Sequence, residues 1–555
     1  MNQSRRAFLR HSVGALAGPF LVSRGLHAAP APPTAQPKLS VRAYGAKGDG
    51  QASDTRAIQL ALDAAGRARG IVYFPPGRYL SGTLRLRSHT TLELDADAAL
   101  VASRNDDDFD PIEDLGYDAF ADPETASFRF ALLQGRGLEQ VRILGSGRID
   151  GNRTSREGPK PIALKECRNV EIRDVTIGNA GNYNISLVGC DGVDILGVTI
   201  LNGYSDGIDP DCCQNVRIAH CHVSSRDDAI CLKTSYALGR RGTTRNVTVT
   251  NCHLTTLHNA FKLGTESVGD FKNIIFSNCT IVGRRHAWKG YLSTGVAIET
   301  VDGGHLEHVS VSNIRMTDVR APLFIRLAER GRAPGTPPAG RLRNISIANL
   351  VAVGALAASS ITGIPGHLVS NIALKNIRTT AGGGGAAELV ERVVPELEKA
   401  YPDAYMFGDL PAYGLYCRHV DGLKLDGVDL NVDQRDARPA VVLDDVRRAV
   451  IRALQAVPPA DGSPLVWLRS ARECRLEGLR PRPGTKILLR LSGSDTSRIQ
   501  VVRSDLRQVE KLAILDAGAA QTALRVEASA MPAAAELADA VGKTRGGRPA
   551  PVETQ

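Results

Sequence analysis

The sequence has few aromatic residues and little excess charge, and both shortages bear on its partners. Phe, Trp and Tyr together make up 5% of its 555 residues, although 43% are hydrophobic, and the formal net charge is only +9. With no basic run and few aromatic side chains on which bases could stack, nucleic acid is not expected as a partner. The core must be built mainly from Val, Ile and Leu, a composition that suits stacked strands.

Cysteine is not scarce, but none of the ten cysteines shows the spacing of a zinc site. Cys221, Cys252 and Cys279 hold the same place in similar segments, a place that valine or isoleucine takes in others. This interchange indicates buried apolar packing. The adjacent Cys212 and Cys213 leave a disulfide open. We expect no metal and no cofactor.

The N-terminus carries Arg5-Arg6, an apolar run from Val13 to Val22 and a small-residue site near Ala28. That run is shorter than the ~20 residues of a membrane-spanning helix. The twin arginines match a bacterial Tat signal, with a basic surface helix as the alternative. We therefore predict a signal peptide over residues 1–28, a linker over 29–37, and a periplasmic or secreted protein. Without the signal's four arginines the net charge is +5, which suits an acidic polysaccharide.

Short alternating segments repeat at a fixed step in the middle of the chain. Cys167, Cys190 and Cys213 each precede a similar run and lie 23 residues apart. Such a period, with strands and no helices, is typical of a β-solenoid, whose successive coils stack about 4.8 Å apart. The step from Cys221 to Cys252 is 31 residues. It predicts a loop of about eight extra residues within 236–243.

We assign residues 38–527 to one solenoid domain. Asp54 is the expected N-cap of a helix that runs to about Ala65 and covers the open edge of the first coil. Residues 105–128 form an Asp-rich loop, either a cleft wall or simply solvated. Residues 528–555 are expected to be a flexible tail.

An insertion over residues 381–413 breaks the repeat. We expect a helical run over 386–400, followed by a segment with Tyr401, Tyr405, Phe407 and Tyr413. This segment could be mere decoration of the solenoid, but its aromatic side chains favour a cleft wall that stacks on sugar rings.

Three aspartates and a histidine fall on neighbouring coils. Asp206 precedes the pair Asp227-Asp228 by about one period, and His258 follows Cys252 by the six residues that separate Asp227 from Cys221. A single aspartate here would be a solvated turn residue. A cluster is different, because like charges raise one another's pKa and let one carboxyl act as an acid while another acts as a base. Hydrolysis of a glycosidic bond requires such a pair.

The order of these residues resembles glycoside hydrolase family 28, which comprises polygalacturonases and rhamnogalacturonan hydrolases. The family pattern is Asn-Thr-Asp, then Asp-Asp, then Gly-His-Gly. This chain has Tyr-Ser-Asp206, Asp227-Asp228 and Leu-His258-Asn in the same order. The resemblance covers most of residues 38–430. The resemblance implies an all-β, right-handed parallel β-helix of the pectin-lyase-like type with an N-terminal capping helix. It also implies inversion at the anomeric carbon, with Asp227 as general acid, Asp206 and Asp228 activating water, and His258 tuning the acid.

The chain departs from the family at its fourth motif, Arg-Ile-Lys. Ala297 and Glu299 stand where the two cations would hold a uronate. Glu299 would repel a carboxylate unless another cation compensates, and Lys233, Lys262 and Arg326 are the candidates. If they compensate, rhamnogalacturonan or substituted oligomers should be preferred over unbranched polygalacturonate.

Two other functions stay open at this point. A polysaccharide lyase on the same fold would need calcium and an Arg or Lys base, whereas this sequence offers paired acids and a histidine. A non-catalytic carbohydrate-binding solenoid would bind pectin without turnover. We expect a monomer whose partner is a pectic polysaccharide or oligosaccharide, with no contact to membranes once the signal is removed.

Overall fold

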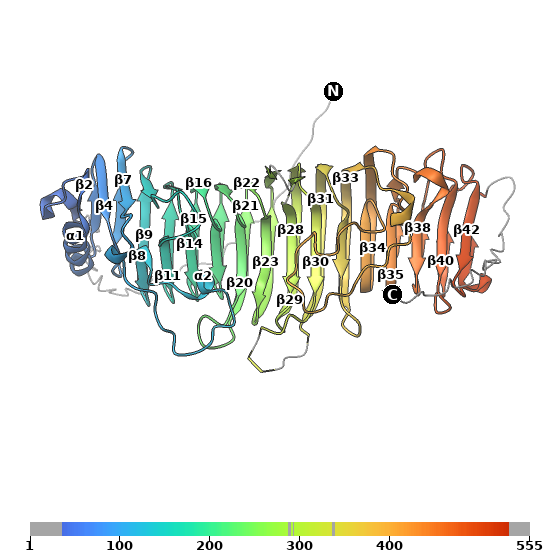
Figure 1. The fold of residues 1–555 in the computed structure, drawn as a ribbon, viewed down its shortest axis with the longest axis horizontal. Coiled ribbons are helices and arrows are strands. Elements are labelled where there is room, and N and C mark those ends of the chain that lie inside the picture. Colours follow the sequence, from blue (N-terminus) through green and yellow to red (C-terminus); the bar gives the residue numbers. More distant parts are fainter. Residues whose placement is uncertain (1–35, 287–289, 292, 333, 336–338, 532–555) are drawn as a thin grey trace, which may run out of the picture. The chain divides into compact units, whose positions relative to one another are not determined.

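The computed structural model describes residues 36–286, 290–291, 293–332, 334–335 and 339–531. A 41-stranded parallel sheet winds through the described chain from residue 38 to residue 527. Its strands return to the same three faces coil after coil, and this defines a parallel β-helix, as predicted (Figure 1). The predicted signal peptide and most of the linker and tail lie outside the described residues.

Three stacks of strands make up the coils. The face that carries the acids, here called the site sheet, consists of β5 (Leu84–Arg85), β8 (Ala131–Arg136), β11 (Lys160–Lys165), β14 (Ile185–Val188), β17 (Ile208–Asp211), β20 (Ile230–Thr234), β23 (Asn259–Ser267), β28 (Thr294–Thr300), β30 (Ala321–Leu327), β32 (Ser359–Thr362), the start of β34 (Leu415–Gln434), β35 (Val441–Arg447), β38 (Pro464–Arg469), β40 (Ile487–Ser492) and β42 (Lys511–Asp516).

The second stack consists of β1 (Lys38–Ser40), β3 (Ile71–Phe74), β6 (Thr91–Leu94), β9 (Glu139–Gly145), β12 (Arg168–Arg173), β15 (Asp191–Leu196), β18 (Gln214–Ala219), β21 (Thr243–Thr250), β24 (Asp270–Ser277), β29 (His305–Thr317), β31 (Arg341–Ala355), β33 (Val369–Gly383), part of β34, β36 (Val450–Arg452), β39 (Arg475–Glu477), β41 (Ile499–Val502) and β43 (Leu524–Glu527).

The third stack consists of β2 (Asp49–Ser53), β4 (Gly77–Ser81), β7 (Ala98–Ala102), β10 (Arg148–Asp150), β13 (Thr176–Gly178), β16 (Thr199–Gly203), β19 (His222–Ser225), β22 (His253–Thr256), β25 (Thr280–Gly283), the later parts of β29, β31, β33 and β34, and β37 (Gln455–Ala456). The remaining described elements are the hairpin β26 (Arg285–His286) and β27 (Gly290–Tyr291), the helices α1 (Thr55–Ala68) and α2 (Pro123–Ala126), and the turns η1 (Val41–Tyr44), η2 (Asp106–Asp108), η3 (Ala387–Leu389), η4 (Ala460–Gly462) and η5 (Gln521–Ala523).

The observed register matches the predicted repeat. Val193 pairs with Val216 across β15 and β18, a step of 23 residues. Val216 pairs with Val247 across β18 and β21, a step of 31. The extra residues lie between Thr234, where β20 ends, and Thr243, where β21 begins. The predicted loop is therefore confirmed.

Cysteines form part of the packed interior, as expected from their exchange with valine. Cys167, Cys190 and Cys213 lie one above another, and Cys221, Cys252 and Cys279 do the same on another face. All ten cysteines are buried free thiols. Stacked thiols thus fill interior positions between the Val, Ile and Leu ladders.

Asparagines stack at the bends between sheets. Asn313 donates its side-chain amide to Asn278 Oδ1 at 2.9 Å and accepts one from Asn349 at 2.9 Å. Each of these asparagines has a positive φ, near 55°. Asparagine tolerates this left-handed conformation better than most residues, so one residue type both turns the backbone and joins adjacent coils.

Figure 1 shows α1 at the N-terminal end of the stack. The helix follows Asp54, near the predicted start, and buries Ile58, Ala61, Leu62 and Ala65. Asp54 does not bond the helix N-terminus with its side chain. Its carboxylate instead accepts the backbone N–H groups of Lys47 and Gly48.

The predicted helix over residues 386–400 is wrong. Only the short turn η3 forms there, because Pro395 and Pro402 lie within or just after the run and cannot donate a helical hydrogen bond. The segment instead lays its apolar side chains on the outer face of the site sheet. They form a second cluster of buried residues comprising Ala297, Ala321, Phe324, Ala358, Val390, Val394, Ala404, Phe407, Leu410, Ala412, Tyr416, Val442 and Trp467.

In the described part of the chain, no helix is long and apolar enough to cross a membrane.

The asparagine ladder predicts an order of stabilities. Asn313→Ala should lose about 1–2 kcal/mol through left-handed strain and about 0.5–1.5 kcal/mol for each of two hydrogen bonds. Asn313→Gly loses the bonds without the strain. Calorimetry should therefore rank the unfolding temperatures as wild type, then glycine, then alanine. Ser312→Ala is the neighbouring control, and equal unfolding temperatures for all four proteins would refute a role for the ladder.

Candidate active site

The four predicted site residues lie in the turns that lead from the third stack into the site sheet. Asp206 lies between β16 and β17, the pair Asp227-Asp228 between β19 and β20, and His258 between β22 and β23. Ile208 pairs with Ile230, and Ile230 pairs with Phe261. This register places Asp206 level with Asp228, and Asp227 level with His258. The structure therefore brings the four residues together on three adjacent coils.

Asp206 and Asp228 are buried and face one another. The backbone N–H of Asp228 donates to Asp206 Oδ1 at 3.1 Å. Oxygens of the two carboxyls and Cys231 Sγ all lie within 4.8 Å of one another, a set that could in principle ligate a metal ion. However, Lys233 Nζ lies 2.9 Å from Asp206 Oδ2 and Lys262 Nζ lies 3.1 Å from Asp228 Oδ2. Each carboxyl therefore already has a positive partner.

Asp206 belongs to a buried network with Asp209, Lys233 and Tyr183. Lys233 Nζ lies 2.9 Å from Asp209 Oδ1 and donates to the Tyr183 hydroxyl at 2.9 Å. Burial, and then the charge of Asp209, raise the pKa of Asp206 well above its usual value, although Lys233 opposes this. Asp206, beside Asp209, thus retains a proton at a pH where an exposed aspartate has lost it.

The pKa of Asp228 moves in the opposite direction. Burial alone would raise it, but Lys262, His258 and the side-chain amide of Asn259 together lower this pKa to about 2. Asn259 donates both its backbone N–H, at 3.0 Å, and its side-chain amide, at 2.7 Å, to Asp228 Oδ1. Two facing carboxyls are thus held in different protonation states, so Asp228 is ionised and available as a base beside a protonated Asp206.

Asp227 is the most accessible of the three acids, with 19% of its side chain exposed. Its carboxylate contacts the guanidinium of Arg156, which also binds Glu124 Oε2 at 2.6 Å. The hydroxyls of Ser225 and Thr256 donate to the Asp227 carbonyl oxygen and fix the turn. Asp227 is therefore presented to solvent on a rigid turn.

The four residues predicted to bind substrate are all buried, and three of them are engaged by other protein groups, whereas the carboxyl oxygens of Glu299 have no hydrogen-bond partner among the described residues. Lys233 and Lys262 serve as counter-charges to the acids. Arg326 donates to the carbonyls of Gly363, Glu396 and Leu397 and so anchors the insertion. Glu299 is 0% exposed, and burial raises its pKa to about 8. An uncharged, buried Glu299 does not repel a substrate carboxylate, so the expected repulsion does not follow.

Sequence reasoning missed Arg156, which belongs to the loop between β10 and β11 and carries no motif. It found the insertion but not which of its aromatic residues are free. Tyr401 is 54% exposed, and its hydroxyl lies 3.5 Å from Lys262 Nζ. Phe407 and Tyr413 are buried. One end of the insertion therefore lies beside the acids, while its remainder covers the sheet.

Comparison with known proteins gives the class of this chain. Residues 130–392 match the family model described as glycosyl hydrolases family 28, and residues 39–99 match the model described as rhamnogalacturonase A/epimerase, pectate lyase-like. Together with the site, these matches make the chain a glycoside hydrolase on a parallel β-helix. Residues 130–392, somewhat less than half of the chain, are similar to family 28.

Curated relatives agree with this class. A probable polygalacturonase of Vitis vinifera is 26% identical over 368 residues, covering 60% of this chain and 72% of the relative. A polygalacturonase of Ralstonia nicotianae is 26% identical over 332 residues, covering 49% of this chain and 61% of the relative. An endo-polygalacturonase of Pectobacterium carotovorum subsp. carotovorum is 23% identical over 360 residues, covering 58% and 83%.

Solved structures share the fold. The exopolygalacturonase of Thermotoga maritima superposes with a TM-score of 0.53 at 18% identity, covering 62% of this chain and 87% of that one. The family 28 exopolygalacturonase of Yersinia enterocolitica gives a TM-score of 0.53 at 17% identity, covering 75% and 78%.

Glu299 predicts a pH-dependent stability. Its pKa is about 8 in the folded protein against an ordinary value of 4.5, so between these pH values the native state keeps a proton that the unfolded state has released. Stability should therefore fall as the pH rises through this range. Glu299→Gln removes the effect, and its unfolding temperature should exceed that of the wild type more at pH 8 than at pH 5.

The exposed Glu388→Gln serves as the control for this prediction. A difference between the Glu299→Gln variant and the wild type that is the same at both pH values would contradict a buried, protonated Glu299.

Proposed function

We propose that this glycoside hydrolase cleaves glycosidic bonds in galacturonate-containing pectic polysaccharides, polygalacturonan or rhamnogalacturonan, with inversion at the anomeric carbon. The observation that carries the proposal is the pairing of Asp206 with Asp228, whose pKa values are shifted in opposite directions, beside the accessible Asp227. The relatives named above are polygalacturonases, and this supports the substrate class.

The proposed mechanism uses each acid in one role. Asp227 gives a proton to the glycosidic oxygen as the bond to the anomeric carbon breaks. A water molecule attacks that carbon from the opposite face and loses its proton to the ionised Asp228. Asp206, whose carboxyl accepts the backbone N–H of Asp228, makes a second hydrogen bond to the attacking water. The proton later leaves Asp228 through solvent, and Asp227 regains one for the next cycle.

Inversion requires the acid and the base to act from opposite faces of the sugar. Inverting enzymes separate acid and base carboxyls by roughly 6.5–9.5 Å to leave room for water. Asp206 and Asp228 lie close together, which suits a shared role in holding and activating that water. Asp227 instead contacts Arg156 of the loop between β10 and β11, which leaves it the separate role of acid.

The guanidinium of Arg156 donates a hydrogen bond to the Asp227 carboxylate. This contact has to break before Asp227 can take up a proton and donate it to the substrate. A uronate carboxylate offers Arg156 a new partner of the same kind. We therefore propose that substrate binding transfers Arg156 from Asp227 to the sugar acid. This residue would compensate for the two cations missing at Ala297 and Glu299.

Exposed aromatic side chains flank the acids on the C-terminal side. Tyr401 lies over Lys262, and Tyr405 stands 5.8 Å from the Arg320 guanidinium. An aromatic face with a nearby cation suits a sugar ring that carries a carboxylate. We propose that this end of the insertion is a wall of the substrate site.

The lyase alternative fits the site less well. A lyase needs a free basic Lys or Arg, but Lys233 and Lys262 are held in ion pairs with the acids. The buried pair of carboxyls with opposite pKa shifts has a direct use in hydrolysis. A non-catalytic solenoid would not require such a pair.

Export completes the proposal. A polymeric cell-wall substrate lies outside the bacterial cytoplasm, and the predicted Tat signal at residues 1–28 would deliver the enzyme to the periplasm or beyond.

Asp227→Asn should lower kcat by about 10²–10⁴ because it removes the proton donor, while leaving the unfolding temperature unchanged. Activity would be measured on polygalacturonate and on rhamnogalacturonan, with chromatography of the products. Asp194→Asn, which changes a partly exposed aspartate that is paired with Arg217 on a neighbouring coil, should keep full activity. An Asp227→Asn enzyme with more than a third of wild-type activity would exclude Asp227 as the general acid.

Arg156→Gln should weaken binding of acidic substrates more than of neutral ones. Loss of one charge-assisted contact of about 1.5–3 kcal/mol corresponds to a roughly 10- to 100-fold rise in KM for polygalacturonate. Its methyl ester should show a much smaller change. Arg245→Gln, on the second stack, is the control. An equal effect on the acid and on its ester would show that Arg156 does not bind the carboxylate.

A further inference from the structure

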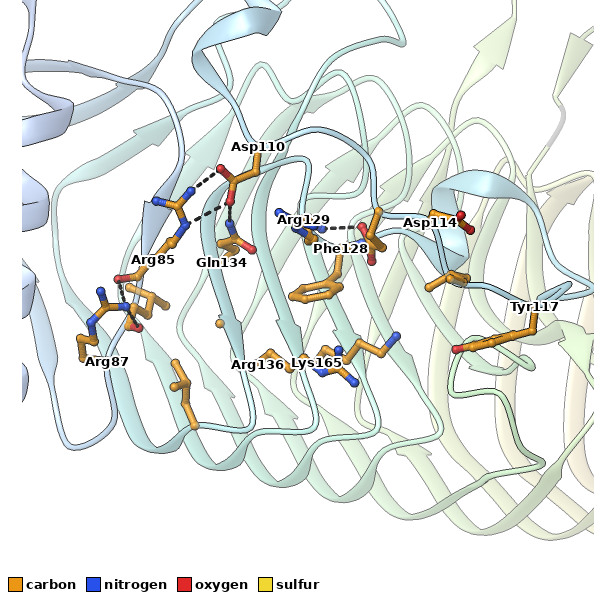
Figure 2. A pocket seen from close by; sticks show the side chains of 15 residues that line it. Arg85, Arg87, Asp110, Asp114, Tyr117, Phe128, Arg129, Gln134, Arg136 and Lys165 are labelled. Atoms are coloured by element: carbon orange, nitrogen blue, oxygen red, sulfur yellow. Dashed lines mark hydrogen bonds and ion pairs between the residues drawn. The ribbon is translucent and has the colours of Figure 1, made fainter.

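A cavity lies on the site sheet, toward the N-terminus from the acids. It measures about 550 Å³ and is formed where the segment from residue 110 to residue 129 passes over β5, β8 and β11. Figure 2 shows Phe128 and Tyr117 along its wall, with Lys165, Arg136 and Arg129 around it. Nothing in the mechanism above uses this cavity.

Lys165 is the most unusual residue of the cavity. Only 3% of it is exposed, and its ammonium donates to the Ala237 carbonyl at 3.0 Å. Within the described ranges it has no carboxylate partner. Burial lowers the pKa of Lys165 from its usual value. The ammonium also lies 5.5 Å from the centre of the Phe128 ring. One hydrogen bond and one aromatic contact leave N–H groups of this buried ammonium without an acceptor oxygen, which favours an anion beside it.

Arg129 adds a second available cation. Its backbone N–H is bound by Glu113, but its guanidinium makes no hydrogen bond or ion pair with any residue that the structure describes. The Arg136 guanidinium lies at the rim and makes a 3.2 Å contact with Glu166 Oε2. Both guanidiniums are accessible from the cavity.

The acids of the cavity already have partners. Asp110 binds Arg85 and the side-chain amide of Gln134. Glu113 accepts the backbone N–H groups of Phe128 and Arg129, at 2.8 and 2.9 Å. Asp114 is exposed and accepts the backbone N–H of Gly116. The backbone partners of Glu113 and Asp114 are neutral, so these two acids keep their charge. Among the cations that line the cavity, Lys165 and Arg129 are the two without an ion-pair partner in the described part of the chain.

This cavity shares a sheet face with the acids but is separate from them. Lys165 pairs with Val188, Val188 with Asp211, and Asp211 with Lys233. Three strand spacings correspond to about 14 Å. Ala119 and Ala126 pack on Val188 between the two places. A flexible acidic polymer on this face could contact both.

We propose that this cavity binds a uronate residue of an acidic oligosaccharide, with its carboxylate between Lys165 and Arg129 and its ring against Phe128 and Tyr117. The site lies outside the acid cluster and would hold the polymer rather than cleave it. The choice of a uronate over other anions rests on the proposed function. The aromatic wall favours a sugar over a bare phosphate.

Lys165→Met tests the proposal because methionine has a similar length and carries no charge. Calorimetric titration with galacturonate oligomers would be done in an Asp227→Asn background, where turnover is blocked. The added Lys165→Met change should lower the affinity at least about tenfold, the loss of one charge-assisted contact. The unfolding temperature should not fall, since a buried unpaired charge is removed.

Arg129→Gln should weaken binding in the same direction, and Arg480→Gln, at the far end of the solenoid, should not. Methyl-esterified oligomers should bind the cavity variants and their parent alike. Unchanged affinity in both cavity variants would overturn the proposal, as would inorganic phosphate displacing the oligomer from the cavity at equal concentration. Binding is measured without turnover, so a wild-type enzyme that hydrolyses no pectin would refute the proposed function and leave this test intact.

Discussion

Parallel hydrogen bonding between successive coils places side chains of equivalent position about 4.8 Å apart. That spacing is favourable for Val, Ile and Leu, which stack into the interior. It is unfavourable for like charges on the outer face of the site sheet. Asp206 and Asp228 lie on adjacent coils, so this spacing brings their carboxyls close together. Two buried carboxylates at that distance would destabilise the fold without compensating positive charges. The rest of the site follows from how that compensation is made.

Two lysines from the same sheet face supply it. Lys233 lies among Asp206, Asp209 and Tyr183, and Lys262 binds Asp228. Their unequal surroundings separate the two carboxyls into one with a raised pKa and one with a pKa of about 2. Using these lysines for the acids removes them as substrate ligands. The substrate's charge must then be met by side chains of the surrounding loops, of which Arg156 is the closest to Asp227.

Much of the fold could be predicted because a solenoid repeats. The 23-residue step of the cysteines gave the register, and from it the neighbourhood of Asp206, Asp228 and His258. The predictions that were wrong concern segments whose contacts do not repeat from coil to coil. The run at 386–400 has helical composition, but its proline and the apolar face of the site sheet favour an irregular segment in which only the turn η3 forms. From the sequence, Arg326 is a candidate to bind the substrate carboxylate. In the structure its guanidinium donates to carbonyl groups of that same insertion. Loop residues such as Arg156 reach the acids through ion pairs that no local pattern encodes.

The central claim is that Asp227 protonates the leaving oxygen while Asp228, across the turn, receives the proton of the attacking water. Proton NMR of the product in the first moments of hydrolysis of a galacturonate oligomer tests it most directly. The account predicts that the new reducing end first appears with the anomeric configuration opposite to that of the cleaved bond. A product that first appears with the original configuration would require a covalent intermediate and would contradict it.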